Sequence, residues 1–125
     1  MDKPSFQGGV NIAVKIPPAS YERTLAFYRD VLGMALEQVA PGASTIAQSH
    51  RCRFGPNTLW LDMVPGMERV ETWLELRTDD LPAARAHLTE HGVALEDHLE
   101  PLPAGFAGHW IRSPAGTVHL VCEPR

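Results

Sequence analysis

The sequence is poor in cysteine and lacks long apolar runs. Its two cysteines, Cys52 and Cys122, lie far apart and belong to no C-x-x-C motif. Residues 1–9 contain no apolar core of the kind that a signal peptide has, and no apolar run approaches the length of a membrane span. We therefore expect a cytoplasmic protein with reduced thiols and no membrane partner.

Runs of like charge are also missing. The 11 Lys and Arg residues and the 15 Asp and Glu residues are dispersed, and the net charge is −4. Without a basic patch, the sequence does not favour nucleic acid or an anionic membrane as a partner. It also contains no P-loop, dinucleotide fingerprint or G-x-S-x-G motif. The 125 residues, 44% of them hydrophobic, are enough for one domain with a core.

What the sequence does contain is an internal repeat. Residues 33–38 (GMALEQ) match residues 92–97 (GVALED), at an offset of 59 residues. The same offset pairs His50 with His109, Arg53 with Arg112, Thr58 with Thr117, Leu59 with Val118, and Leu61 with Leu120. One register kept over so many positions indicates two diverged copies of a single module.

Each copy predicts the element order β-α-β-β-β. In the first copy, alternating apolar residues predict a strand at 12–16, followed by a helix with Ser20 as its N-cap and Gly33 at its end. In the second copy, a strand at 74–78 precedes a helix that Asp80 caps, with Pro82 in its first turn and Gly92 at its end. The remaining strands are expected near 34–40, 44–54 and 57–64, and near 93–98, 104–112 and 117–123.

These elements predict an α+β fold in a single domain of residues 1–125. We expect module one at about 9–64, a linker at about 65–69 and module two at about 70–125. In one such module, the helix covers one face of the sheet and the other face needs a partner. Two modules can therefore curl their sheets into an open, barrel-like cleft.

Three segments resemble the vicinal oxygen chelate superfamily, which includes glyoxalase I, bleomycin-resistance proteins and extradiol dioxygenases. Residues 25–33 (LAFYRDVLG) resemble the first helix of that family, which ends in F-Y-x-x-x-L-G. Residues 113–116 (SPAG) resemble its D-P-x-G turn before the last strand, and residues 78–80 match the polar start of its second helix. The resemblance covers nearly the whole chain and implies the fold, but it does not imply a particular reaction.

The resemblance also implies a metal site with four ligands, one from the first and one from the last strand of each module. Strand alternation places the following residues toward the cleft: Asn11, Ala13, Lys15, Trp60, Asp62, Trp73, Glu75, Arg77, His119 and Val121. The ligand positions then carry Asn11, Trp60 or Asp62, Trp73, and His119. Trp cannot bind a metal and Asn binds transition metals poorly. The ligand set is therefore incomplete, and we expect no cofactor. Any metal would bind His119 and Asp62, with Glu75 or a partner chain completing the set.

Three of these residues are candidates for catalysis. His119 could act as a general base or a ligand, or be an ordinary hydrogen-bonded strand histidine. Glu75 and Asp62 could do acid–base chemistry, or they could pair with Lys15 or Arg77 in a partly buried ionic network. The candidates for substrate binding are Asn11, Lys15, Trp60, Trp73, Arg77 and Trp110. The three tryptophans could bind a flat ligand, or they could plug the barrel or a dimer contact.

Different classes of function remain open on this reading. The chain could be a glyoxalase-like lyase, isomerase or dioxygenase that acts on a small oxygenated metabolite. It could instead bind a drug in a metal-free cleft, as bleomycin-resistance proteins do, or be a degenerate member with a regulatory or subunit role. Each reading has a small molecule as the partner, and the resemblance implies a homodimer.

Overall fold

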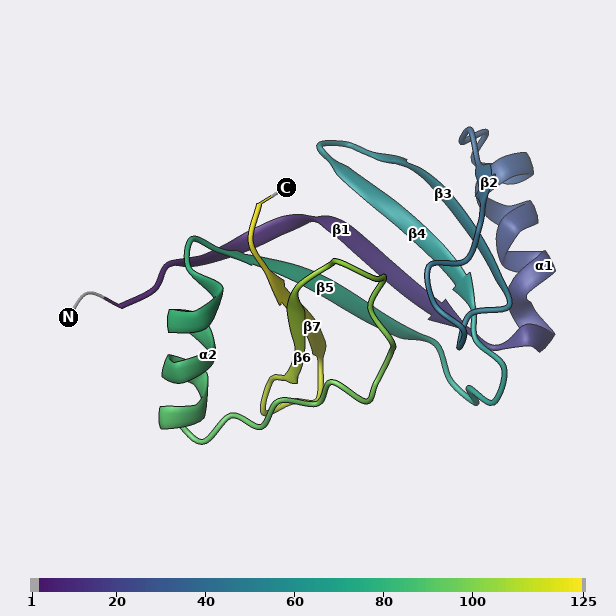
Figure 1. Ribbon diagram of the computed structural model, residues 1–125. Coiled ribbons are helices and arrows are strands. Elements are labelled where there is room, and N and C mark those ends of the chain that lie inside the picture. The colour runs from purple at the N-terminus through teal and green to yellow at the C-terminus, as the bar shows by residue number, and fades with distance from the viewer. Residues whose placement is uncertain (1–2, 125) are drawn as a thin grey trace. The chain divides into compact units, whose positions relative to one another are not determined.

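The computed structural model describes residues 3–124. Three residues lie outside the described part of the chain. Met1 and Asp2 belong to the segment 1–9, where we expect no signal peptide, and Arg125 is the last residue of the expected second module. The fold is α+β (Figure 1). Its elements are β1 (Phe6–Ile16), α1 (Pro18–Ala26), the π-helical turn η1 (Phe27–Val31), β2 (Glu37–Val39), β3 (Gln48–Phe54), β4 (Asn57–Met63), β5 (Glu71–Thr78), α2 (Leu81–Glu90), β6 (Gly108–Arg112) and β7 (Val118–Cys122).

The chain divides into two compact units. The first unit is Val10–Thr72, and the second unit contains the chain up to Gly9 together with the chain from Trp73 onward. Strand β1 therefore contributes its first residues to the second unit and its remaining residues to the first. Among the described residues, no helix is long and apolar enough to cross a membrane.

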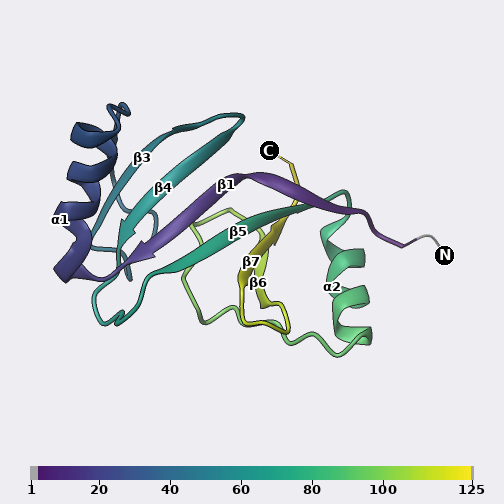
Figure 2. The same ribbon diagram turned by 180° about the vertical axis from the view of Figure 1, so that it is seen from behind.

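The first unit is a sheet with strand order β2-β3-β4-β1, and α1 lies along it in both ribbon views (Figures 1 and 2). Strands β1 and β4 are parallel, whereas the β3 pairs with β2 and with β4 are antiparallel. The strands predicted after the first helix are confirmed in place, although the first of them has only three residues.

Helix α1 begins at a proline. Pro18 occupies the start of the helix, where its missing N–H costs nothing, and no side chain caps the helix. The prediction of Ser20 as the N-cap is therefore wrong, since Ser20 lies within the first turn and both its N–H and its hydroxyl donate to the Pro17 carbonyl. Gly33 ends the helical segment as predicted, with a φ of 70° that suits glycine.

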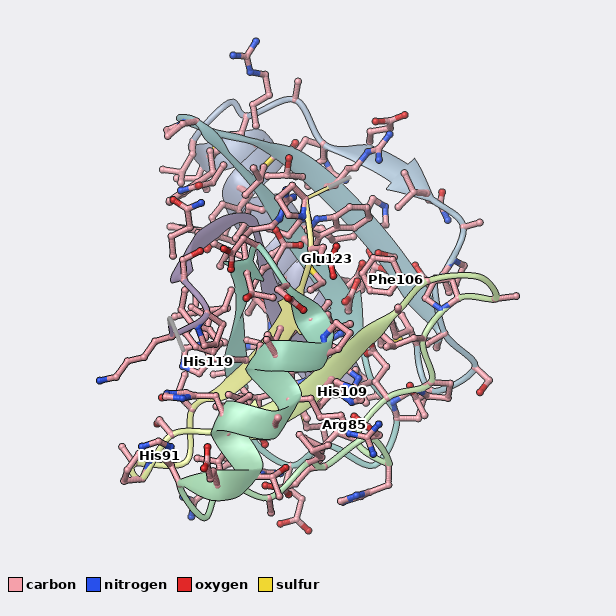
Figure 3. All side chains as sticks on the ribbon, turned by 60° about the vertical axis from the view of Figure 1, so that its left-hand side comes forward. Arg85, His91, Phe106, His109, His119 and Glu123 are labelled. Atoms are coloured by element: carbon pink, nitrogen blue, oxygen red, sulfur yellow. The ribbon has the colours of Figure 1, made fainter. Side chains whose placement is uncertain are left out.

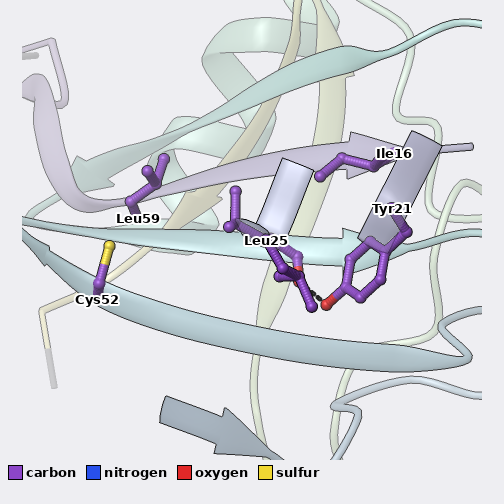
Figure 4. Packing of buried hydrophobic residues seen from close by; sticks show 6 residues of the cluster. Ile16, Tyr21, Leu25, Cys52 and Leu59 are labelled. Atoms are coloured by element: carbon purple, nitrogen blue, oxygen red, sulfur yellow. Dashed lines mark hydrogen bonds between the residues drawn. The ribbon is translucent and has the colours of Figure 1, made fainter. Parts of the chain in front are cut away.

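The core of the first unit lies between α1 and the sheet (Figure 4). Its buried members are Ile16, Tyr21, Leu25, Cys52, Leu59 and Leu61, with Ile12, Val14 and Met63 among the residues packed against them. The Tyr21 hydroxyl donates to the Leu61 carbonyl oxygen at 2.8 Å, so His50 Nδ1, 2.7 Å away, must donate to the Tyr21 oxygen. Burial raises the pKa of Tyr21. The alternate residues of β1 and β4 therefore face away from α1, as the alternation predicts.

The second unit has the strand order β5-β7-β6, with β5 and β7 parallel and β6 antiparallel to β7. The prediction of Asp80 as the α2 cap is confirmed, because its carboxylate accepts the Ala83 N–H at 3.0 Å. Gly92 follows the helix at a φ of 76°, also as predicted. The core between α2 and the sheet contains Leu81, Ala84, Ile111 and Val121, packed with Leu76, Leu88, Val93 and Leu95.

The strand predicted at 93–98 does not form, and this prediction is wrong. The segment lies against β6 through one backbone bond, from Glu96 N–H to the Trp110 carbonyl at 2.7 Å. The Trp110 N–H is then taken by the Asp97 carboxylate rather than by a backbone carbonyl, so no ladder develops. The next predicted strand starts only at Gly108, because a turn at Pro103 and Gly105 precedes it.

Candidate functional site

A buried ionic network lies on the face of the first unit that points away from α1. The parallel pairing of β1 with β4 sets Lys15 beside Asp62, and the β3–β4 hairpin sets Ser49 on the other side of Asp62. Lys15 Nζ lies 2.8 Å from Asp62 Oδ2, and the Ser49 hydroxyl donates to Asp62 Oδ1 at 2.6 Å. All three side chains are buried. Asp62 therefore forms the ion pair that was one of its two expected roles.

Asn11 and Trp60 form a second polar contact on the same face. The Trp60 indole N–H donates to Asn11 Oδ1 at 2.8 Å. The guanidinium of Arg51 lies over the Trp60 ring, 5.4 Å from its centroid, and Arg51 Nε also donates to Glu37 at 3.0 Å. Trp60 and Asn11 are only half-buried, so this part of the face reaches solvent.

The second unit carries an ion pair on strand β5. Arg77 Nε donates to Glu75 Oε1 at 2.8 Å, and the side chains are 19% and 3% exposed, respectively. The backbone of Gly9 lies so close to the Glu75 carboxylate that any side chain at Gly9 would collide with it. Glycine therefore allows β1 to cover the Glu75 side chain.

The two tryptophans of the second unit pack against each other. Their rings meet edge to face with centroids 5.0 Å apart, and Trp73 and Trp110 are only 6% and 5% exposed. The Trp110 indole N–H donates to the Glu100 carbonyl at 2.8 Å. Of the two expectations for the tryptophans, packing fits these two rings better than binding a ligand, whereas Trp60 remains accessible.

His119 lies on the opposite side of the sheet from the side that we predicted. Val121 packs into the core beneath α2, so His119, two residues earlier on β7, lies on the α2 side as well. Its Nδ1 is 3.1 Å from the Leu74 carbonyl oxygen. The His119 side chain is labelled in Figure 3. Leu120 pairs with Glu75 and occupies the face where His119 was expected. The structure therefore does not bring His119 to Glu75, and Val121 was likewise assigned to the wrong face.

The reason is a turn that differs in length between the two copies. In the first unit, Gly55 and Pro56 separate the paired residues Phe54 and Asn57. In the second unit, the N–H of Ser113 donates to the Thr117 carbonyl, which leaves three residues, 114–116, in the loop.

The longer loop shifts the register of the repeat by one residue. Ile111 follows Cys52 by 59 residues, whereas their strand partners His119 and Leu59 are 60 residues apart. A shift of one residue turns every side chain of a strand to the other face. With this register, the four ligand positions that the resemblance implies would carry Asn11, Trp60, Trp73 and Leu120.

These four positions do not suit a divalent metal. Trp and Leu have no donor atom for it, and Asn11 Oδ1 accepts the Trp60 N–H. Both oxygens of Asp62, one of the two expected ligands, are taken by Lys15 and Ser49. Within residues 3–124, no group of three or more His, Cys, Asp and Glu residues is placed to hold a metal ion. The donor set thus disagrees with the metal site that the resemblance implies.

Ser49, Arg51 and Gly9 are site residues that the sequence reasoning missed. A signal for the first two was present, because counting outward from the two-residue turn at 55–56 pairs Ser49 with Asp62 and Arg51 with Trp60. No local pattern indicates Gly9. A surface cavity of 550 Å³ in the loop after β4, lined by residues 64–69 and Glu71, contains none of the predicted site residues.

Comparison with known proteins identifies relatives of the fold. Residues 12–118 match the family model described as Glyoxalase/Bleomycin resistance protein/Dioxygenase superfamily. No curated protein matches the chain. Among solved structures, a hypothetical protein from Bacillus halodurans C-125 is similar with a TM-score of 0.68 and 15% identity, over 97% of this chain and 96% of that one.

Two solved enzymes are also similar. Methylmalonyl-CoA epimerase from Mycobacterium tuberculosis has a TM-score of 0.61 and 17% identity, over 94% of this chain and 88% of that one. Homoprotocatechuate 2,3-dioxygenase from Arthrobacter globiformis has a TM-score of 0.63 and 17% identity, over 97% of this chain but 37% of that one. At these identities the likeness shows the fold alone.

Proposed function

Because the chain belongs to the glyoxalase/bleomycin resistance protein/dioxygenase superfamily, we propose that it binds a small organic molecule without a chelated metal. The observation that carries this proposal is the bond between Asn11 and Trp60. At two positions where the resemblance implies metal ligands, the side chains instead form a hydrogen bond with each other. The indole ring of Trp60 is half-exposed, and the guanidinium of Arg51 lies over it.

The polar residues on the same face of the sheet as this ring support a binding role. Lys15, Asp62 and Ser49 form a buried network on the same face of the first unit. A buried ion pair is often no more stabilising than apolar residues of similar size, so stability alone gives little reason to keep one. We propose that the network holds Trp60 and Asn11 in a fixed arrangement for a flat or apolar ligand.

Sequestration of such a ligand, as in bleomycin-resistance proteins, is the first version of this proposal. A lyase or isomerase that works without a metal is the second, and the buried Glu75 carboxylate favours it, because a carboxylate fixed by Arg77 could move a proton. A dioxygenase fits less well, since three of the four implied ligand positions carry Trp or Leu, which offer no metal donor. We also carry forward a cytoplasmic location, on the two isolated cysteines, and a homodimer, on the family resemblance. Sedimentation velocity would measure the oligomeric state.

Tryptophan fluorescence tests the binding proposal. The protein is titrated with a panel of aromatic and glycopeptide ligands, bleomycin included, with and without EDTA. We expect at least one ligand to give a saturable change that EDTA leaves intact. We also expect Trp60→Phe and Asn11→Ala to weaken it, whereas Arg29→Gln, on the exposed surface of η1, retains it.

Two outcomes would contradict the proposal. One is binding that appears only after zinc, nickel, manganese or iron is added. The other is a flat response to the whole panel by folded protein.

A further inference from the structure

The guanidinium of Arg77 donates a hydrogen bond to Glu75 along one edge, and its other edge faces solvent. Arg77 and Glu75 lie two residues apart on β5 and therefore on the same face of the strand. The Glu75 side chain is 3% exposed and the Arg77 side chain is 19% exposed, so the carboxylate is buried while the guanidinium reaches solvent.

Only part of the hydrogen-bonding capacity of Arg77 is used within the unit. A guanidinium has five N–H donors in a planar fork, and the contact with Glu75 uses the one on Nε. Among residues 3–124, neither Nη atom of Arg77 donates to another side chain or to the backbone. Every buried side-chain nitrogen and oxygen of the described residues has a partner, so these Nη donors face water.

The surroundings of Arg77 on this face are apolar and small. In its row across the sheet, Arg77 pairs with Cys122, and Cys122 pairs with Gly108, which has no side chain. The next row carries Leu120 and Trp110 beside Glu75. Phe106 packs against Gly108, because a Cβ there would lie 3.2 Å from the Phe106 ring. A cationic fork thus stands beside an apolar strip in which Leu120 and Phe106 are half-buried, whereas Cys122 and Trp110 are buried.

We infer that Arg77 is an anchor for the carboxylate of an aromatic or otherwise apolar acid. A planar fork with two parallel N–H groups matches a carboxylate in geometry and charge. Glu75, 2.8 Å from Arg77 Nε, already supplies one negative charge, so a monoanion is better tolerated than a doubly charged phosphate. This inference goes beyond the proposed function, since Arg77 belongs to the second unit whereas Asn11 and Trp60 belong to the first.

Calorimetric titration of the full chain with 2-naphthoate, its neutral amide 2-naphthamide and inorganic phosphate tests the inference. We expect naphthoate to bind about tenfold or more tightly than naphthamide, since bonds to a charged partner are the strong ones. Arg77→Gln should remove that preference. Arg77→Lys, which keeps the charge and loses the fork, should restore only part of it.

Arg112→Gln is the matched control, because Arg112 forms an exposed ion pair with Glu96 in the same unit. Circular dichroism melts establish that each variant is folded, and Arg77→Lys serves as the second variant if Arg77→Gln does not fold.

Equal affinity for acid and amide, or naphthoate binding that both Arg77 variants retain, would overturn the inference and leave the proposed function standing. Tighter binding of phosphate would overturn the carboxylate assignment. No binding of any of the three compounds would overturn it as well, while binding in the wider fluorescence panel tests the proposed function separately.

Discussion

Asp62 is the residue on which the polar face of the first unit depends. One carboxylate oxygen receives the ammonium of Lys15 and the other receives the hydroxyl of Ser49, at 2.8 and 2.6 Å. Desolvating two charges costs several kcal/mol per ion, which the pair recovers only while both partners are present. The network is therefore sensitive to the loss of either charge alone.

Replacing Asp62 by Ala should destabilise the protein by about 3–5 kcal/mol, because the buried Lys15 ammonium loses the carboxylate oxygen 2.8 Å away. Urea unfolding measures this. The double variant Lys15→Met/Asp62→Leu should recover much of the loss, since it removes both charges together. The exposed Asp30→Ala, which breaks the surface pair with Arg29, should leave the urea midpoint unchanged. A double variant no more stable than Asp62→Ala would show that the charges are not the cause.

The ionic partners of both carboxylates were among the alternatives that the sequence offered. Alternation along a strand predicts which residues share a face, and Lys15, Asp62, Glu75 and Arg77 carry opposite charges on predicted faces. The partners of the tryptophans could not be predicted in this way. Whether an indole is packed or open depends on neighbours from other strands, and Trp73 and Trp60 differ in this respect.

At the scale of elements, the two helices begin in different ways. Asp80 accepts the Ala83 N–H at the start of α2, and Glu123 accepts the Leu81 N–H at 2.8 Å. Helix α1 has no side-chain cap, and its first turn relies on Pro18. The stability of α2 therefore depends on a particular side chain, whereas the start of α1 does not.

Asp80→Ala should lower the free energy of unfolding by about 1 kcal/mol, the usual cost of losing an N-cap. Ser20→Ala is the matched control in α1 and should have little effect, because the Ser20 side chain donates to Pro17 and caps nothing. Thermal unfolding of both variants measures the difference. Equal losses, or a larger loss at Ser20, would contradict this account of the two helix starts.

Most elements could be predicted because their signals are local. Periodicity and turn residues predict the helices and the hairpins of the first unit. The strand at 93–98 failed because Asp97 replaces a backbone partner with its carboxylate, a competition that periodicity does not reveal. The prediction of which β7 residues face the cleft failed for a different reason. The loop at 114–116 sets the register of β7, and an alignment of the two copies without a gap does not reveal its extra residue.

At the scale of the whole molecule, the duplicated fold is that of the superfamily, whereas the residues at its metal-ligand positions have diverged. The first unit carries Asn11 and Trp60 there, joined by a hydrogen bond, and the second carries Trp73 and Leu120. Asn11, Trp60 and Trp73 stay predictions as ligand positions, and the register of β7 puts Leu120 rather than His119 beside Glu75. A fold shared with metalloenzymes therefore supports ligand binding here without implying their chemistry.

The metal content of the protein tests this claim most directly. The chain is incubated with zinc, nickel, manganese or ferrous iron and desalted, and the bound metal per chain is measured by inductively coupled plasma mass spectrometry alongside the melting temperature. We predict far less than one metal ion per chain and no rise in the melting temperature, because a ligand that binds the native state would raise it. One ion retained per chain, with a higher melting temperature that EDTA reverses, would contradict the account.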